Sequence, residues 1–320
     1  MVWGALAAML SMVVLSVWTA TVWTRAPQPG AGIIEVSIPR GASIGQVADA
    51  LEAAGVIESA EAFELAARLI GDDRPVQFGT YAFEQGEGWA KILERMQKGQ
   101  TVIVKVLIPE GMPSIMVAER LRAMKRLTGP VDVPAEGTVL PATWEAKPGE
   151  PRSVVLKRMQ AGMVDTLDEL WPTKTDRSAV KTKDEAVILA SIVQKETGDA
   201  SEYRRIAGVY TNRLKQGMKL DADPTVIYPS TKGKPLRRRI RRSELRADNG
   251  YNTYVRKGLP QGPIANPGRE AIAAVLNPES HDFLYFVADG TGGHVFAETY
   301  PAHQANVDKW YAIRRSKGEM

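Results

Sequence analysis

The chain has 320 residues, and among them there is no cysteine and there are only three histidines. Without thiols it can form no disulfide, no thiolate nucleophile and no cysteine-based metal site. His281, His294 and His303 do not have the H-E-x-x-H spacing of a zinc hydrolase. Aromatic residues make up only 7% of the chain, but a hydrophobic share of 44% is enough for packed cores. The composition therefore favours an ordinary folded protein without a metal site.

Charge is missing from the N-terminus. Residues 2–23 contain no charged side chain, and the first charge is Arg25. As a helix these residues would span about 33 Å, which is enough for a bilayer core. Trp3, Trp18 and Trp23 lie toward its ends, where interfacial aromatics are expected. A cleaved signal peptide is the alternative, but its apolar region would be shorter and would end at a small-x-small site, and no convincing A-x-A stands directly before Arg25. The sequence predicts a membrane anchor over residues 1–24 and a Pro/Gly-rich linker over residues 25–32.

The chain as a whole is mildly basic, with a net charge of +4. This balance is compatible with an anionic wall polymer, with lipid headgroups or with nucleic acid. Five arginines cluster near the middle of the C-terminal half, at positions 237, 238, 239, 241 and 242. No aromatic residue is interleaved with them, so a solvated face is favoured over a nucleic-acid site.

Residues 33–108 have the pattern of a small module with strands at both ends. A strand from Ile33 precedes a helix that Ser43 can cap and Gly55 can end. A second helix is expected over residues 61–70, a turn-rich piece at residues 79–81, a third helix over residues 89–98 and a strand over residues 102–108. Residues 109–180 then predict a linking subdomain with helices near residues 114–124 and 154–170. In this subdomain Trp144 is either a buried core residue or a residue that stacks on a sugar ring.

Residues 182–198, T-K-D-E-A-V-I-L-A-S-I-V-Q-K-E-T-G, predict an amphipathic helix. Thr182 and Glu185 have the spacing of a capping box, and Gly198 is a natural stop. At 100° per residue, one apolar stripe collects Leu189, Ile192 and Val193.

Glu196 continues that apolar stripe, four residues after Ile192 and three after Val193. A carboxyl group on a core-facing stripe is partly desolvated, which raises its pKa toward the value that a general acid needs near neutral pH. The alternative is that the last turn frays and Glu196 points to water, because a carboxylate at a helix C-terminus is poorly matched to the helix dipole.

Other polar residues lie between Asp221 and His294. Asp223 precedes Pro224, an arrangement typical of a helix N-cap followed by proline at the first helical position. A substrate-positioning role for Asp223 is the second alternative, and a metal site shared with Asp221 is the least favoured. Asn252 lies just before the Pro/Gly-rich run of residues 258–268, and Asn266 lies within it. Amide side chains there suit the acetamido and hydroxyl groups of amino sugars, although the run can also be just a rigid connection. His294 follows a Gly-rich turn between expected strands at residues 283–287 and 295–298, and this turn lacks the residues of a phosphate loop.

The helix over residues 182–198 resembles the catalytic helix of the endolytic murein transglycosylases, membrane-anchored enzymes that cut peptidoglycan glycan strands. The resemblance continues in order through N-R-L-K-Q-G-M-K-L-D-A-D-P-T-V-I-Y at residues 212–228, Y-N-T-Y at 251–254, G-L-P-Q-G-P-I-A-N-P-G at 258–268 and Y-F-V-A-D-G-T-G-G-H-V-F at 285–296. It covers most of residues 184–312. Gln194 and the pair Asp221-Ala222 depart from the usual family residues, which puts a role for a second carboxylate in doubt.

The resemblance implies an α+β fold: a LysM-like module over residues 33–108, the linking subdomain over residues 109–180 and a mixed α/β catalytic domain over residues 181–316. LysM folds bind polymers that contain N-acetylglucosamine, although a spacer that binds nothing tightly is an equal alternative for this module. The resemblance also implies a single-pass inner-membrane protein with most of the chain in the periplasm.

The same resemblance implies that Glu196 is the catalytic acid and base and that no cofactor or metal is needed. The implied substrate-binding residues are Asp223, Tyr228, Asn252, Tyr254, Asn266 and His294. Peptidoglycan strands and cell wall synthesis enzymes are the implied partners, and nucleic acid is not one. Two alternatives remain: a non-catalytic peptidoglycan-binding scaffold, and a pyridoxal-phosphate lyase, for which no Schiff-base lysine or phosphate cup is evident.

Overall fold

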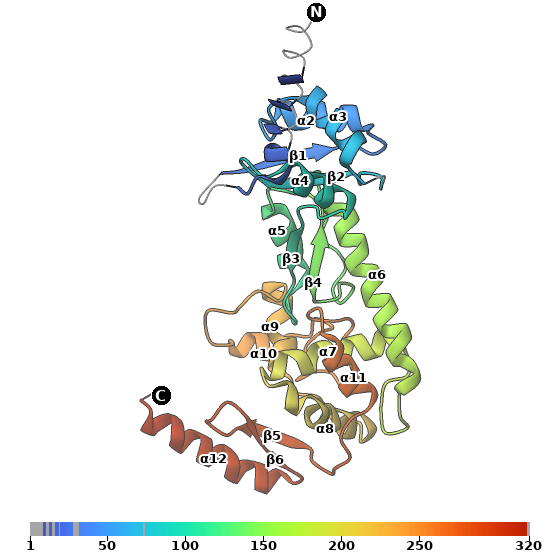
Figure 1. Ribbon diagram of the computed structural model, residues 1–320. Helices are drawn as coiled ribbons and strands as arrows, with labels where there is room; N and C mark the ends of the chain where they lie inside the picture. Colours follow the sequence, from blue (N-terminus) through green and yellow to red (C-terminus); the bar gives the residue numbers. More distant parts are fainter. Residues whose placement is uncertain are drawn as a thin grey trace, which may run out of the picture. The chain divides into compact units, whose positions relative to one another are not determined.

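The computed structural model describes residues 9, 10, 13, 14, 17, 18, 20–27, 32–72 and 74–318. The chain divides into two compact units (Figure 1), one of residues 1–104 with 146–148 and one of residues 105–145 with 149–320. Most of the predicted anchor over residues 1–24 lies outside the described residues. Within the described ranges, no helix is long and apolar enough to cross a membrane.

Among the described residues 32–72 and 74–104, the first unit contains a two-stranded antiparallel sheet and three helices. Strand β1 (Ile33–Ile38) pairs with β2 (Gly79–Glu84), and α2 (Ile44–Ala53), α3 (Ala60–Ile70) and α4 (Trp89–Gln97) complete the unit. All three helices confirm the sequence prediction. Ser43 caps α2 in a full capping box with Gln46, and Gly55 follows the helix at a φ of 74°.

Strand β2 corrects the prediction of a turn-rich piece at residues 79–81. Tyr81 and Phe83 are fully buried and alternate with more exposed neighbours, which is the two-residue period of a half-buried strand. Gly79 and the short length of the run concealed this pattern in the sequence. The strand predicted at residues 102–108 exists as β3 (Val104–Leu107), but it pairs with β4 (Thr143–Ala146) and not with β1 or β2.

The second unit begins with helices that the sequence predicted. They are α5 (Ser114–Ala123) and α6 (Arg152–Leu170), the latter followed by a 3₁₀ turn at Trp171–Thr173. Trp144 of β4 is half-buried, its indole N–H donates to the carbonyl of Leu140 at 3.0 Å, and its ring lies against Gly162 of α6. This contact favours a packing role for Trp144.

Three helices form the centre of the second unit, and they are α7 (Lys183–Glu196), α8 (Tyr203–Lys215) and α11 (Arg269–Leu276). Their shared core includes Leu189, Ile192 and Val193, which are all fully buried as the apolar stripe predicted. A 3₁₀ turn (Ala200–Glu202) joins α7 to α8, and α9 (Asp223–Thr231) and α10 (Arg242–Arg246) follow α8.

The C-terminal part of the second unit is a β-hairpin covered by a helix. Strands β5 (Tyr285–Ala288) and β6 (His294–Ala297) are antiparallel, as predicted, and α12 (Tyr300–Ser316) packs against both strands (Figure 1). The mixture of helices and small antiparallel sheets confirms the α+β class.

Candidate active site

Helix α7 begins and ends so that Glu196 is its last residue. Thr182 is the N-cap, and its hydroxyl accepts the backbone N–H of Glu185 at 3.1 Å. The Glu185 carboxylate accepts the N–H of Lys181 instead of that of Thr182, so the capping box is only half formed. Gly198 is not the stop: the helix ends at Glu196 because Thr197 is extended, at a φ of −135°.

Glu196 is half-buried and has one direct hydrogen bond. The hydroxyl of Tyr210, from α8, donates to Glu196 Oε1 at 2.7 Å. Burial raises the pKa of Glu196 to about 7, and the negative charge of Asp223 adds to this rise. The Tyr210 hydrogen bond and the positive charge of Arg213 act in the opposite direction. The carboxyl group is therefore poised to give or take a proton near neutral pH.

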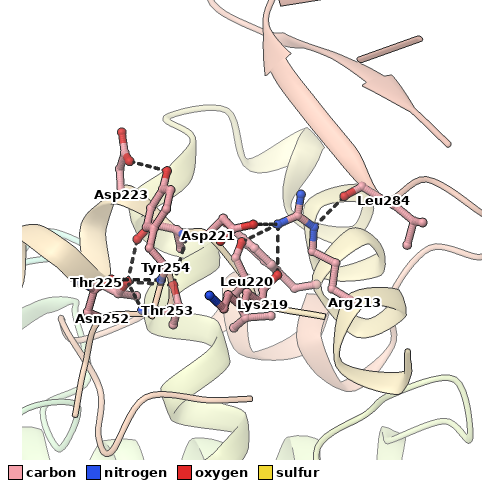
Figure 2. A network of polar contacts seen from close by, with 12 residues as sticks. Arg213, Lys219, Leu220, Asp221, Asp223, Thr225, Asn252, Thr253, Tyr254 and Leu284 are labelled. Atoms are coloured by element: carbon pink, nitrogen blue, oxygen red, sulfur yellow. Dashed lines mark hydrogen bonds and ion pairs between the residues drawn. The ribbon is translucent and has the colours of Figure 1, made fainter. Parts of the chain in front are cut away.

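Arg213 fixes the segment that follows α8. Its guanidinium donates to the carbonyls of Leu284, Lys219 and Leu220 and forms an ion pair with Asp221 at 3.2 Å (Figure 2). Asp221 has a φ of 49°, a left-handed conformation that is uncommon for a residue with a side chain. Arg213 thereby ties α8 both to this turn and to the residue just before β5.

Asp223 and Tyr254 meet at the start of α9. The Tyr254 hydroxyl donates to Asp223 Oδ1 at 2.7 Å (Figure 2). The structure corrects the prediction that Asp223 is an N-cap: Ala222 is the N-cap, it has no side-chain cap, and Asp223 is the first helical residue. Its carboxylate still stands at the positive end of a helix, a favourable place for it.

A cavity of about 470 Å³ brings these groups together. One side carries Glu196, Tyr210 and Arg213, and the β5–β6 hairpin with α12 supplies an aromatic wall. In that wall His303 stacks on Tyr285, with ring centroids 5.2 Å apart, and Tyr300 is 60% exposed beside them. The full lining is Glu196, Tyr210, Arg213, Leu220, Asp221, Asp223, Tyr254, Tyr285, Phe286, Tyr300 and His303.

The surroundings of His303 in this wall favour its neutral form. Burial and the charge of Arg213 lower its pKa, and its Nδ1 is buried with no hydrogen-bond partner among the described residues. Stacking adds the His303 ring to the aromatic wall beside Tyr285.

Of the seven site residues that the sequence singled out, the structure brings Glu196, Asp223 and Tyr254 together in the cavity. The side chains of Tyr228, Asn252, Asn266 and His294 do not line it. The Asn252 amide donates to three carbonyls near α10 and accepts the N–H of Tyr254 at 2.9 Å, so it holds the loop that presents Tyr254.

The other three residues are similarly occupied within the protein. Asn266 is fully buried. Its side-chain oxygen accepts the N–H of Val139, and its amide donates to the carbonyl of Met112. The Tyr228 hydroxyl donates to Glu136 at 3.2 Å. His294 Nδ1 lies 2.7 Å from a carboxylate oxygen of Glu202. These contacts support positioning roles, because the polar groups already have partners.

Several residues of the cavity were not identified from the sequence, namely Tyr210, Arg213, Tyr285, Phe286 and Tyr300. Tyr210 and Arg213 did carry a signal: they are three residues apart on the α8 face that buries Ile206 and Ala207. Polar side chains on an apolar stripe are the same anomaly that identified Glu196. The aromatic wall carried no comparable signal, because only the folding of α12 onto the hairpin assembles it.

Within the described ranges, no group of three or more acidic residues or histidines is placed to hold a metal ion. The cavity lining also contains no lysine, so it offers no amine for a Schiff base. The fold and the site thus define an α+β protein with one carboxyl group that titrates near neutrality in an aromatic-walled cavity.

The chain belongs to the YceG-like family, which matches residues 36–309. It is 26% identical, over 89% of its length and 86% of the relative, to the endolytic murein transglycosylase of Bacillus subtilis. It is 27% identical to that of Streptococcus pneumoniae over 86% of its length, and there it spans only 58% of the relative. A crystal structure of a putative yceG-like protein from Listeria monocytogenes has the same fold, with a TM-score of 0.54, 27% identity and coverage of 86% of this chain and 99% of that one.

Proposed function

We propose that this protein is an endolytic lytic transglycosylase that cleaves the β-1,4 bond between N-acetylmuramic acid and N-acetylglucosamine in peptidoglycan. Its family and its relatives named endolytic murein transglycosylase support a role in peptidoglycan cleavage. The observation that carries the reaction type is Glu196, a half-buried carboxyl with a pKa of about 7 in a cavity of about 470 Å³.

In the first step the neutral Glu196 donates its proton to the glycosidic oxygen. The bond from that oxygen to the muramic C1 breaks, and the leaving sugar departs with a new hydroxyl. The substrate's own acetamido group stabilises the cation that develops at C1. Tyr210 can stabilise the carboxylate that Glu196 becomes, because its hydroxyl already donates to Oε1 at 2.7 Å.

In the second step the Glu196 carboxylate takes the proton of the muramic C6 hydroxyl. The C6 oxygen bonds to C1, which closes a 1,6-anhydro ring and restores the neutral acid. Water takes no part, so the reaction needs no second carboxylate to activate it, unlike hydrolysis by paired carboxylates. Asp223 accepts a hydrogen bond from the Tyr254 hydroxyl and is not needed to activate water. Its negative charge instead raises the pKa of Glu196.

The aromatic wall supports a saccharide as the ligand. Tyr285, Tyr300 and His303 line the cavity that holds the acid, and aromatic rings pack against the apolar faces of sugars. The proposal includes the role expected from the sequence: a membrane-anchored enzyme that acts on nascent strands outside the cytoplasm, alongside wall synthesis enzymes, and so limits strand length. The LysM-like role of the first unit belongs to the same proposal.

The decisive experiment is mass spectrometry of uncrosslinked glycan strands after digestion with the purified protein. Internal cleavage with 1,6-anhydromuramyl ends is the expected result. Reducing ends alone would mean hydrolysis and would refute the transglycosylase assignment. The competing function, a non-catalytic scaffold, predicts bound but intact strands.

A further inference from the structure

A second cavity, of about 820 Å³, lies at the other end of α7 from Glu196. Four segments meet there: the loop before α7, the first turn of α7, the end of α8 and the start of the Pro/Gly-rich run at residues 257–259. Lysines come from every segment except the first turn of α7. They are Lys174 and Lys181 from the loop, Lys215 from the end of α8 and Lys257 from the run.

Four lysines and one acidic residue give the lining of this lysine cavity a net positive charge. Glu185 is the one acidic residue in the lining, and its carboxylate accepts the backbone N–H of Lys181. The ammonium group of Lys215 lies 3.5 Å from the carbonyl of Asp176. Over the described part of the chain, the ammonium groups of Lys174, Lys181 and Lys257 have no hydrogen bond or ion pair. Such an arrangement attracts an anionic ligand.

The lining also has an apolar side. Val180 is buried, and Leu214 and Leu259 are half-buried. No arginine lines the cavity, so the paired donors that suit a phosphate are absent from its lining side chains. The lysine ammonium groups can pair with carboxylates, and the aliphatic side chains can pack against apolar carbon atoms. A short acidic peptide offers both kinds of group.

We propose that the lysine cavity binds the carboxylates of a peptide carried by the glycan strand at a muramic residue away from the bond that is cleaved. This inference rests on the proposed function. Glu185 and Glu196 are eleven residues apart on α7, so the two cavities are separated by about 16 Å along the helix. The reacting sugar cannot fill both, but a strand with its peptides can reach from one to the other. The cavity would thereby select strands that still carry peptides.

The test measures binding without turnover, in the full-length protein with Glu196→Gln. Its probes are two defined short glycan strands with peptides, one with free peptide carboxylates and one with carboxamides in their place. The variant pair Lys181→Gln/Lys257→Gln is compared with Lys125→Gln/Lys157→Gln, two exposed lysines of the same unit outside both cavities. Both pairs remove the same charge, and thermal melting checks that both fold.

We expect the cavity pair to weaken binding of the carboxylate strand about 3- to 10-fold, the scale of two solvent-accessible ion pairs. The control pair and the carboxamide strand should show no change. Glu185→Gln, which removes the one negative charge, should tighten binding of the carboxylate strand about 2-fold.

Equal binding by the two variant pairs would overturn the inference, as would an equal loss on both strands. Competition by inorganic phosphate, with no preference for carboxylate over carboxamide strands, would assign the cavity to phosphate instead. Because binding is measured without cleavage, a failure to form 1,6-anhydro ends would refute the reaction and leave this result standing.

Discussion

At the scale of single residues, the pKa of Glu196 is a balance between burial and three neighbours. Burial and Asp223 favour the neutral acid, while Tyr210 and Arg213 favour the carboxylate. The cavity is partly shielded from water, so each neighbour acts more strongly than it would at the surface. Substitution of one neighbour at a time should therefore move the pKa in a known direction.

Tyr210→Phe and Asp223→Asn should shift the pH profile of the reaction in opposite directions. Loss of the Tyr210 hydroxyl removes a hydrogen bond to the carboxylate, so the limb of kcat/KM that falls near pH 7 should move to higher pH. Loss of the Asp223 charge should move it to lower pH. Shifts of both variants in the same direction would contradict this account of the site.

Glu196→Gln should abolish turnover and leave the fold intact. The substitution keeps the volume of the side chain but removes the transferable proton, which typically costs about 10²- to 10⁴-fold in rate. Glu185→Gln at the other end of α7 serves as the control, assayed on glycan strands without peptides, which do not engage the lysine cavity. Its carboxylate bonds a backbone N–H at the helix start, and its loss should cost about 1 kcal/mol of stability. Near-normal turnover of Glu196→Gln would make Glu196 structural and direct attention to Asp221 and Asp223.

The same substitution should change how stability depends on pH. The pKa of Glu196 is about 7 in the folded protein against an ordinary value of 4.5, so the folded state holds a proton that the unfolded state releases between these values. The stabilisation is complete below pH 4.5 and is lost as the pH rises through 7. Glutamine does not titrate, so the Tm of Glu196→Gln relative to the wild type should be higher at pH 8 than at pH 4.5. A Tm difference that is the same at both pH values would contradict the raised pKa.

At the scale of elements, the approach of α8 to the loop before β5 depends on Gly208. A Cβ atom there would lie 2.7 Å from the carbonyl oxygen of Glu279 and would also contact the ring of His281. Two more side chains of α8 hold this loop. The Asn212 amide donates to the backbone carbonyls of His281 and Phe283, and Arg213 donates to the carbonyl of Leu284. One face of α8 thus sets the position of the hairpin that carries the aromatic wall.

Gly208→Ala should destabilise the protein by about 1–3 kcal/mol, because the loop must move away from α8. Since Tyr285 follows this loop, activity should fall as well. Gly198→Ala is the matched control: no atom lies within 4 Å of its added Cβ, and its φ is not positive. Urea unfolding of the two variants measures the difference, and equal midpoints would show that the loop adapts without cost.

At the scale of the whole molecule, each unit has its own hydrophobic core, and every residue of the candidate site belongs to the second unit. The site therefore does not depend on the uncharged residues at the N-terminus. Those residues were predicted from sequence alone to anchor the chain.

Deletion of residues 1–24 should move the protein from the membrane fraction to the soluble fraction after cell lysis. The truncated protein should still produce 1,6-anhydromuramyl ends, because the motif-bearing residues all lie downstream. Immunoblotting of the fractions and product analysis give the two readouts. A truncated protein that stays with the membrane would place the attachment elsewhere in the chain.

The sequence by itself predicted helices α2 to α7, because caps and apolar periodicity are local; it gave no prediction for α8, α11 or α12. The Thr182 cap, the stripe of Leu189, Ile192 and Val193, and the anomalous carboxyl of Glu196 on that stripe are all visible without a fold. It did not reveal strand β2, whose burial depends on pairing with β1, or the partner of β3. Nor could it separate Asn252 and Asn266, which bond the backbone internally, from residues that line the cavity. Periodicity marks Tyr210 and Arg213 as polar residues on an apolar face of α8, but it does not say which residues lie opposite them. Tertiary structure alone decided that Tyr210, Arg213, Tyr285 and His303 surround Glu196, because their contacts join segments distant in the chain.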